Sequence, residues 1–249
     1  MTETTQLTSA AHGWSMVADA WDTYSDRVEA NHEAESALML ERLTVQPGDR
    51  VLELACGPGR LAATWSARVG PVGSVLISDV APGMVDVARR RASALANVSV
   101  AQLDVSRIDQ PDASFDVIAC RMGLMFAPEP SVAAHEIARV AAPGARIAVM
   151  VWGAIEQNPW MAVVGMAGAM SGILVGGPPV GPGGPFSLGD PSVLQTVLEA
   201  AGLREVAVEL CATVFRSASI DEHVAMVTAL AGPMAAAFSN ATASVSYTL

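Results

Sequence analysis

The chain has 249 residues, of which 51% are hydrophobic and 16% are charged. This length suits one α/β domain, and the composition excludes intrinsic disorder. The apolar surplus predicts either an apolar pocket or an oligomer interface, which leaves a homodimer open. With 25 acidic against 14 basic residues, the net charge of −11 opposes a nucleic-acid backbone, so we expect no nucleic-acid partner.

The cysteines indicate a reducing compartment. Cys56, Cys120 and Cys211 are odd in number and widely spaced, and no CxxC or Cys/His grouping suggests a disulfide framework or a metal site. Residues 1–9 are polar and lack the basic region and apolar core of a secretory signal. The sequence therefore predicts a cytoplasmic protein without a bound metal.

The first 46 residues are predicted to form a helical cover. Apolar residues recur at helical spacing between residues 13 and 41, which predicts one or two amphipathic helices. A Pro-Gly turn at residues 47–48 follows, and then the short apolar run 50–55 (RVLELA). A short apolar run bounded by turn signals is typical of a buried parallel strand.

Strands and helices then alternate through a core of residues 47–155. We expect helices at 60–68, 82–94 and 130–141, and strands at 74–78, 98–103, 115–120 and 145–152. Pro82 and Pro130 stand where first-turn prolines are tolerated. This alternation predicts the α/β class, with a doubly wound, Rossmann-like and mostly parallel sheet flanked by helices.

The region after this core is predicted to contain a lid. Residues 157–189 carry no charge, and the apolar part is too short and too rich in glycine to span a bilayer. We expect residues 156–189 to form an apolar lid insertion, and residues 190–249 to complete a single domain. Within them the pattern predicts a helix capped by Asp190, a strand at 204–215 and a helix capped by Ser219; the tail 244–249 is the only candidate for a last strand.

The strongest chemical signal is the segment 51–61 (VLELACGPGRL), which reads as a strand, a glycine turn and a helix start. Gly57 and Gly59 let a ligand approach the backbone closely, so a nucleotide-like cofactor is indicated. The spacing also matches a relaxed dinucleotide fingerprint, with Asp79 about 20 residues further on, so an NAD(P)-dependent oxidoreductase remains an alternative. Glu53 favours S-adenosylmethionine instead, because a carboxylate attracts an ammonium group and repels a pyrophosphate.

The segment 53–59 (ELACGPG) resembles motif I of class I methyltransferases, of the methyltransferase type 11 kind that includes ubiquinone and menaquinone biosynthesis enzymes. Four more segments resemble the family in the same order: 78–84 (SDVAPGM), 102–105 (QLDV), 112–118 (DASFDVI) and 134–144 (AHEIARVAAPG). The resemblance covers roughly residues 14–152. Five ordered segments are far more specific than any one of them.

The resemblance implies which residues hold the cofactor. Glu53 would meet the amino-acid portion, Asp79 the ribose hydroxyls and Asp104 the adenine amino group. Tyr24 would reach the methionyl carboxylate or the substrate from the N-terminal cover. The complete implied set is Tyr24, Glu53, Ala55, Gly57, Gly59, Asp79, Val80, Met84, Asp104, Val105 and Arg121.

The predicted function is S-adenosylmethionine-dependent methyl transfer to a small, largely apolar metabolite, with a non-catalytic S-adenosylmethionine-binding protein as a further alternative. Methyl transfer is an in-line displacement that depends mainly on alignment and exclusion of water. We expect residues 160–186 and the N-terminal aromatic residues to form the acceptor pocket.

No catalytic acid or base is assigned. Related quinone-pathway enzymes often carry a histidine after the fourth strand, where this chain has residues 124–126 (LMF). His135 and His223 are expected to be solvated, and for His12 and His32 a surface position is favoured over one in the pocket. Cys56 is expected to be a small buried hydrophobic residue without chemistry.

Overall fold

The computed structural model describes residues 3–172 and 181–231 of the chain. Within them the strands are β1 (Arg50–Leu54), β2 (Ser74–Asp79), β3 (Val98–Gln102), β4 (Phe115–Arg121) and β5 (Ala141–Met150). The helices are α1 (Glu3–Met16), α2 (Ala18–Asn31), α3 (Glu33–Leu43), α4 (Ala62–Val69), α5 (Pro82–Ala92), α6 (Pro130–Val140), α7 (Pro159–Met170), α8 (Pro191–Ala200) and α9 (Ile220–Leu230), with short 3-10 turns η1 (Leu124–Phe126) and η2 (Ile155–Gln157).

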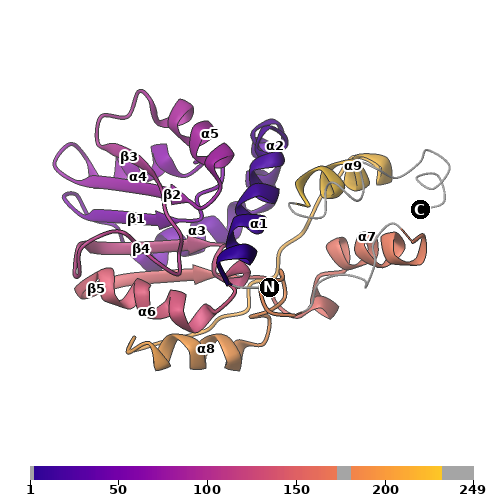
Figure 1. Ribbon diagram of the computed structural model, residues 1–249. Coiled ribbons are helices and arrows are strands. Elements are labelled where there is room, and N and C mark those ends of the chain that lie inside the picture. The colour runs from indigo at the N-terminus through magenta and orange to yellow at the C-terminus, as the bar shows by residue number, and fades with distance from the viewer. Residues whose placement is uncertain (1–2, 173–180, 232–249) are drawn as a thin grey trace.

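The five strands form one parallel sheet in the order β3-β2-β1-β4-β5 (Figure 1). Helices α4, α5 and α6 connect successive strands, which confirms the predicted doubly wound, Rossmann-like class. The chain order reverses direction at β1, because β2 and β4 pair with its two sides. In open α/β sheets, ligands bind outside the carboxyl ends of the strands at this switch point.

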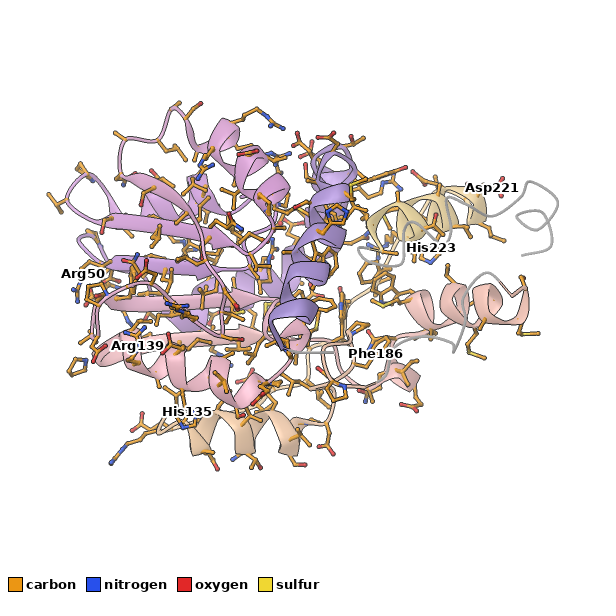
Figure 2. The ribbon with its side chains drawn as sticks, in the orientation of Figure 1. Arg50, His135, Arg139, Phe186, Asp221 and His223 are labelled. Carbon is orange, nitrogen blue, oxygen red and sulfur yellow. The ribbon has the colours of Figure 1, made fainter. Side chains whose placement is uncertain are left out.

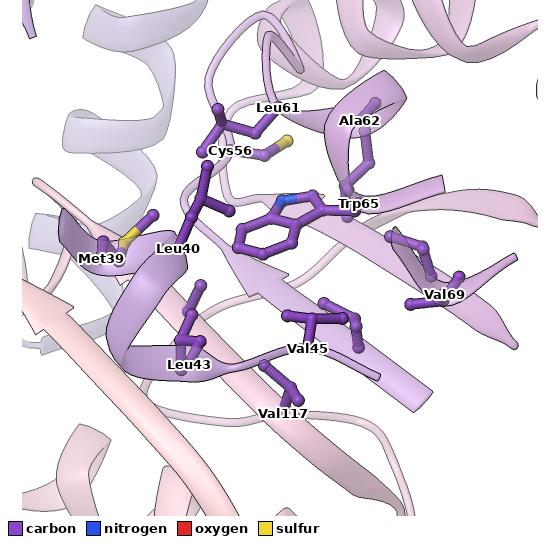
Figure 3. Packing of buried hydrophobic residues seen from close by; sticks show 14 of the residues in the cluster. Met39, Leu40, Leu43, Val45, Cys56, Leu61, Ala62, Trp65, Val69 and Val117 are labelled. Carbon is purple, nitrogen blue, oxygen red and sulfur yellow. The ribbon is translucent and has the colours of Figure 1, made fainter. Parts of the chain in front are cut away.

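Alternate residues of β1 face two separate cores, as the period of two in a strand requires. Val51 joins a buried cluster with Leu40 and Leu43 of α3 and with Trp65 of α4 (Figure 3). Leu52 and Leu54 point to the opposite face, where α6 and α8 cover the sheet. Both faces of the sheet are therefore buried, which explains the continuous apolar run in the sequence.

Helices α1 and α2 lie at the carboxyl edge of the sheet, and α7 and α9 extend beyond them (Figure 1). Helix α1 packs on α5, and α9 contacts both α2 and α7. A third cluster joins α5 to the N-terminal helices: Val17 and Ala18 pack against Met84, with Trp14 and Trp21 at its border. Over the two described stretches, no helix combines the length and apolarity that crossing a bilayer requires.

Two predicted helix caps are confirmed. Asp190 accepts a hydrogen bond from the Ser192 backbone at 2.8 Å at the start of α8. Ser219 accepts one from the Glu222 backbone at 3.1 Å at the start of α9. Both caps satisfy amide groups that the first helical turn leaves without an internal partner.

The predicted strand at residues 204–215 is wrong. This segment is irregular and does not pair with the sheet; side-chain bonds hold it instead. Arg42 pairs with Glu209 at 2.8 Å, and Thr213 donates to the Asn31 carbonyl at 3.0 Å. An alternating pattern of apolar and polar side chains forms a strand only where a neighbouring strand supplies backbone hydrogen bonds. The predicted last strand at 244–249 lies outside the described residues.

Candidate functional site

The turn after β1 places its two glycines in different surroundings. Gly57 and Gly59 both have left-handed backbone, with φ of 54° and 76°. A Cβ at Gly57 would meet nothing within 4 Å, whereas a Cβ at Gly59 would lie 3.0 Å from the Ala88 Cβ on α5. Gly59 therefore lets the turn pack against α5, and Gly57 leaves open space at the switch point.

Strained backbone marks the ends of both central strands. Ala55 after β1 and Met122 after β4 have positive φ values of 52° and 57°, which side-chain-bearing residues rarely adopt. A Cβ on Gly123 would come within 2.3 Å of the Ala55 Cβ, so the two turns touch closely. Such strain concentrates at functional sites, where the surrounding structure enforces it.

Glu53 lies at the heart of this region with only 2% of its surface exposed. Trp65 Nε1 donates a hydrogen bond of 2.8 Å to Glu53 Oε2. Burial raises the pKa of Glu53 to about 7, although the charge of Arg121 and the bond from Trp65 both lower it. A positive charge placed beside Glu53 would therefore favour the ionised form of its carboxyl group.

Asp79 ends β2 and ties the turn to the start of α5. Its carboxylate accepts hydrogen bonds of 2.9 Å from the backbone amides of Gly57 and Ala81. Burial raises the pKa of Asp79, and these backbone bonds oppose the shift. The negative charge of Asp79 also contributes to the raised pKa of Glu53, so the structure brings these two predicted site residues together.

Asp104 stands one strand further along the sheet. It follows β3, is half-buried, and accepts a 2.8 Å hydrogen bond from the backbone of Ser106 in its own turn. Because β3 neighbours β2, Asp104 shares the carboxyl edge of the sheet with Asp79. No described contact joins the two carboxylates, so Asp104 belongs to the edge but not to the Glu53 and Asp79 pair.

The remaining predicted residues fall into two groups. Ala55, Val80 and Val105 line the same edge and are half-buried, as is Tyr24 on α2. Met84, by contrast, is 3% exposed in the cluster that joins α5 to the N-terminal helices, which is a core environment.

The N-terminal helices are fastened over the turn by polar contacts. Arg60, just after the glycine turn, pairs with Asp26 of α2 at 2.9 Å. The Gly83 amide donates to Ser15 Oγ at 3.2 Å, and a Cβ at Gly83 would lie 2.8 Å from the Ser15 carbonyl oxygen. The predicted cover over the site therefore depends on both an ion pair and close backbone packing.

Arg121 lies at the end of β4 and binds the N-terminal helices. Its Nη1 donates to Glu29 Oε1 at 3.0 Å and to Ser36 Oγ at 2.7 Å. Its Nη2 lies 2.9 Å from Glu29 Oε2. This contact is an ion pair without the geometry of a hydrogen bond. Sequence reasoning predicted Arg121 for the site and missed Glu29 and Ser36.

An aromatic cluster, formed by Trp152, Trp160, Phe215 and His32, lies beyond the end of β5. Trp160 stacks on Phe215 with ring centroids 3.8 Å apart, and Trp152 packs against both. Ser187, near the end of the predicted lid, donates to the Met125 carbonyl at 2.6 Å and ties this side to η1. Figure 2 shows His223 and Phe186 on this side of the molecule.

Two histidine predictions were wrong and two were confirmed. His32 is 7% exposed between Trp152 and Phe215, and His223 binds the Trp160 carbonyl through Nε2 at 2.8 Å. His12 is exposed as expected, and so is His135 (Figure 2). His32 lies at the junction of α2 and α3, and its polar neighbours at helical spacing (Ser25, Glu29 and Ser36) give no local signal that it is buried.

The cysteines near the site have no nucleophilic character. Cys56 and Cys120 are buried. Burial raises the pKa of the Cys56 thiol well above its usual range and that of Cys120 to about 12. Both behave as small apolar residues, as predicted for Cys56.

Comparisons with known proteins match this geometry. A family model described as a methyltransferase domain matches residues 51–144. The chain is 32% identical over 161 residues to the ubiquinone/menaquinone biosynthesis C-methyltransferase UbiE of Burkholderia multivorans, over 62% of this chain and 66% of the relative. The protein of the same name from Ectopseudomonas mendocina is 30% identical over 166 residues, with 65% and 64% covered. The chain thus spans slightly less than two thirds of the length of these relatives.

Two solved structures are also similar to this chain. A SAM dependent methyltransferase from Aquifex aeolicus aligns with a TM-score of 0.52 at 26% identity, over 68% of this chain and 79% of that one. The YcgJ protein of a Bacillus species aligns with a TM-score of 0.60 at 20% identity over 87% and 88%, which shows the shared fold. Together with the sheet order and the glycine turn, these matches confirm the resemblance to the class I S-adenosylmethionine-dependent methyltransferases.

Proposed function

We propose that this chain transfers a methyl group from S-adenosylmethionine to a small, largely apolar metabolite. The observation that carries the proposal is the pair of buried carboxylates, Glu53 and Asp79, beside the open side of Gly57. A desolvated carboxylate gains strongly from a cationic or hydrogen-bonding ligand, because the alternative is an uncompensated buried charge. The ammonium group of S-adenosylmethionine suits Glu53, and the ribose hydroxyls suit Asp79.

S-adenosylmethionine supplies a methyl group that its own sulfonium charge already activates. The task of the chain is then to bind, to align and to exclude water. In this proposal the cofactor extends along the carboxyl edge of β1, β2 and β3, with Asp104 toward the base. The other contacts that we assign to it come from Tyr24, Ala55, Gly59, Val80, Met84, Val105 and Arg121.

The acceptor would bind over the ends of β4 and β5, the part of the edge that the cofactor leaves open. The aromatic cluster provides apolar surface there, as does the pair of Trp14 in α1 and Phe126 in η1, whose ring centroids are 5.0 Å apart. The relatives named above are C-methyltransferases of quinone biosynthesis, which supports an apolar acceptor. Residues 156–189 would act as the lid and residues 1–46 as the cover of a single domain.

The composition supports the remaining parts of the proposal. A net charge of −11 disfavours nucleic acid, and widely spaced, unpaired cysteines suit the cytoplasm. A homodimer would account for part of the apolar surplus.

Calorimetric titration tests cofactor identity. S-adenosylhomocysteine should bind the wild-type chain and NAD⁺ should not, because Glu53 repels a pyrophosphate. Glu53→Gln should weaken S-adenosylhomocysteine binding at least about tenfold. Glu41→Gln, an exposed carboxylate on α3, is the matched control and should bind as the wild type does. Tight NAD⁺ binding, or no effect of Glu53→Gln, would overturn the cofactor assignment.

Transfer of labelled methyl groups to a panel of phenols, quinones and amines separates the enzyme from a non-catalytic binding protein. Trp160→Leu should then raise the acceptor KM about tenfold, because it removes the stack on Phe215. Its affinity for S-adenosylhomocysteine should stay unchanged. An equal loss of affinity for both ligands would place the acceptor elsewhere.

A further inference from the structure

A buried histidine lies on the acceptor side of the edge, at the junction of α2 and α3. His32 lies in edge contact with Phe215 and tilted against Trp152, each with ring centroids 5.3 Å away. Trp152 follows β5, which pairs with β4, so this place is the acceptor end rather than the cofactor end of the edge. Nothing in the methyl-transfer chemistry derived so far uses this imidazole.

Glu35 lies in the first turn of α3, three residues after His32, and its carboxylate is near the His32 ring. His32 Nδ1 lies 3.8 Å from Glu35 Oε1, beyond hydrogen-bond distance but within reach of charge attraction. Glu35 is 5% exposed, and both Nδ1 of His32 and Oε2 of Glu35 are buried without a hydrogen-bond partner. A buried pair of this kind costs free energy unless a change in protonation brings the two groups together.

The second ring nitrogen is left for a ligand. Nε2 is the ring nitrogen that the contact with Glu35 does not involve. None of the described residues forms a hydrogen bond with Nε2. The segment that carries Phe215 is irregular and not part of the sheet. It is held next to His32 by Asn31, whose side chain accepts a 3.0 Å hydrogen bond from the Arg216 amide.

The electrostatic surroundings keep the ring neutral. Burial and the charge of Arg121, at the end of β4, lower the pKa of His32 below its ordinary value of 6.5, whereas Glu35 on α3 and Glu29 on α2 raise it. Near pH 7 the imidazole is therefore an unprotonated base with two carboxylates placed to stabilise its protonated form.

The neighbours of the ring indicate which acceptor it serves. Aromatic rings pack favourably edge-on or offset against other rings, and Trp152, Trp160 and Phe215 already pack in this way. An aromatic acceptor would replace the contact of Phe215 with His32. A hydroxyl group on that ring would donate a hydrogen bond to the neutral imidazole, so a phenol suits both the aromatic cluster and His32.

We propose that His32 is the general base for a phenolic acceptor and that Glu35 is its positioning residue. The inference rests on the proposed methyl transfer. The acceptor O–H bond breaks, its proton passes to Nε2, and the electron pair left on oxygen forms the bond to the methyl carbon. The bond between that carbon and sulfur breaks with its electron pair on sulfur, so the sulfonium becomes a neutral thioether.

Two classes of phenol distinguish a base from a structural residue. One is un-ionised at the assay pH, such as catechol; the other is already ionised, such as pentafluorophenol. With S-adenosylmethionine saturating, His32→Asn should lower kcat/KM for the un-ionised phenol by roughly 10²–10⁴-fold and for the ionised phenol by less than about threefold. His135→Asn, an exposed histidine on α6, should change neither value.

A titration that does not depend on turnover tests the pair directly. The histidine ring signals of the uniformly labelled free chain, assigned by loss in His32→Asn, should give His32 a pKa below 6.5. Glu35→Gln should lower that pKa further, because it removes a negative charge beside the ring. Circular dichroism and S-adenosylhomocysteine affinity report whether each variant has folded.

Three results would overturn the assignment: equal loss for both phenols in His32→Asn, an unchanged His32 titration in Glu35→Gln, or a wild-type chain that methylates amines or quinones and no phenol. In each case S-adenosylhomocysteine binding would still support the methyltransferase. If S-adenosylhomocysteine itself fails to bind, the proposed function fails instead.

Discussion

The Glu53 carboxylate and the Trp65 indole form a buried hydrogen bond of 2.8 Å beneath the glycine turn. Trp65 belongs to the apolar cluster between α3, α4 and the sheet (Figure 3), so this bond holds an acidic group at the border of a hydrophobic core. The arrangement keeps Glu53 in place but leaves its charge poorly solvated. The pH dependence of cofactor affinity and the stability of the free chain both depend on this charge.

Cofactor affinity should fall as the pH drops through about 7. In the free chain Glu53 has a pKa of about 7, and a bound ammonium group would lower that pKa. Binding is then coupled to loss of a proton below pH 7 and to none well above it, so affinity rises with pH and then levels off, with a slope of at most about tenfold per pH unit. Calorimetry with S-adenosylhomocysteine from about pH 6 to about pH 8 measures this. Glu53→Gln should remove the dependence, and a pH-independent wild type would contradict the prediction.

Glu53→Gln should stabilise the cofactor-free chain at alkaline pH. An acid whose folded-state pKa is raised favours the fold below its unfolded pKa and loses that contribution as the pH rises through the folded pKa. The shift from 4.5 to about 7 sets an upper limit of about 3 kcal/mol on the gain. Urea unfolding of both chains at about pH 5 and about pH 8 should show a difference that grows with pH. A Gln variant that is less stable at both pH values would show that the carboxylate is structural.

The two glycines of the turn should respond differently to alanine. Gly59→Ala combines a φ of 76° with a 3.0 Å approach to Ala88 and should cost about 2–5 kcal/mol of stability. Gly57→Ala has open space and should cost only about 1–2 kcal/mol, from its φ of 54°. Its methyl group would occupy the ligand side, so S-adenosylhomocysteine affinity should fall at least about tenfold. Denaturant unfolding and calorimetry separate the two effects; equal stability losses would contradict this division.

The ion pair at the opposite end of the sheet should contribute to acid stability. Arg50 donates to Asp116 through Nε at 2.9 Å and Nη2 at 2.8 Å, and these bonds lower the pKa of Asp116 to about 2. The contribution is present above the ordinary pKa of 3.8 and is lost as the pH falls through about 2. Because both side chains are substantially exposed, solvent screening limits it to about 1 kcal/mol or less. Asp116→Asn should flatten the pH dependence of urea unfolding between about pH 4 and about pH 2, while cofactor affinity stays unchanged.

Much of the core could be predicted from local sequence. The run 50–55, the glycine turn and the first-turn prolines determine β1, its turn and the starts of α5 and α6, since each depends on a few neighbouring residues. The caps at Asp190 and Ser219 are likewise local. The segment 204–215 shows the limit: its alternation is that of a strand, but a strand also needs a partner, and alternation contains no information about one.

Local sequence is enough to predict the resemblance to class I methyltransferases, the parallel sheet and the order of acidic residues at the strand ends, because turn chemistry and periodicity act over short stretches of chain. The pairing of Arg121 with Glu29, and the burial of His32 beside Trp152, Phe215 and Glu35, become visible only in the folded chain. These contacts join helices, strand ends and an irregular segment that are far apart in the chain. Their energies depend on how those parts pack against one another, and a residue's local sequence does not specify its distant neighbours.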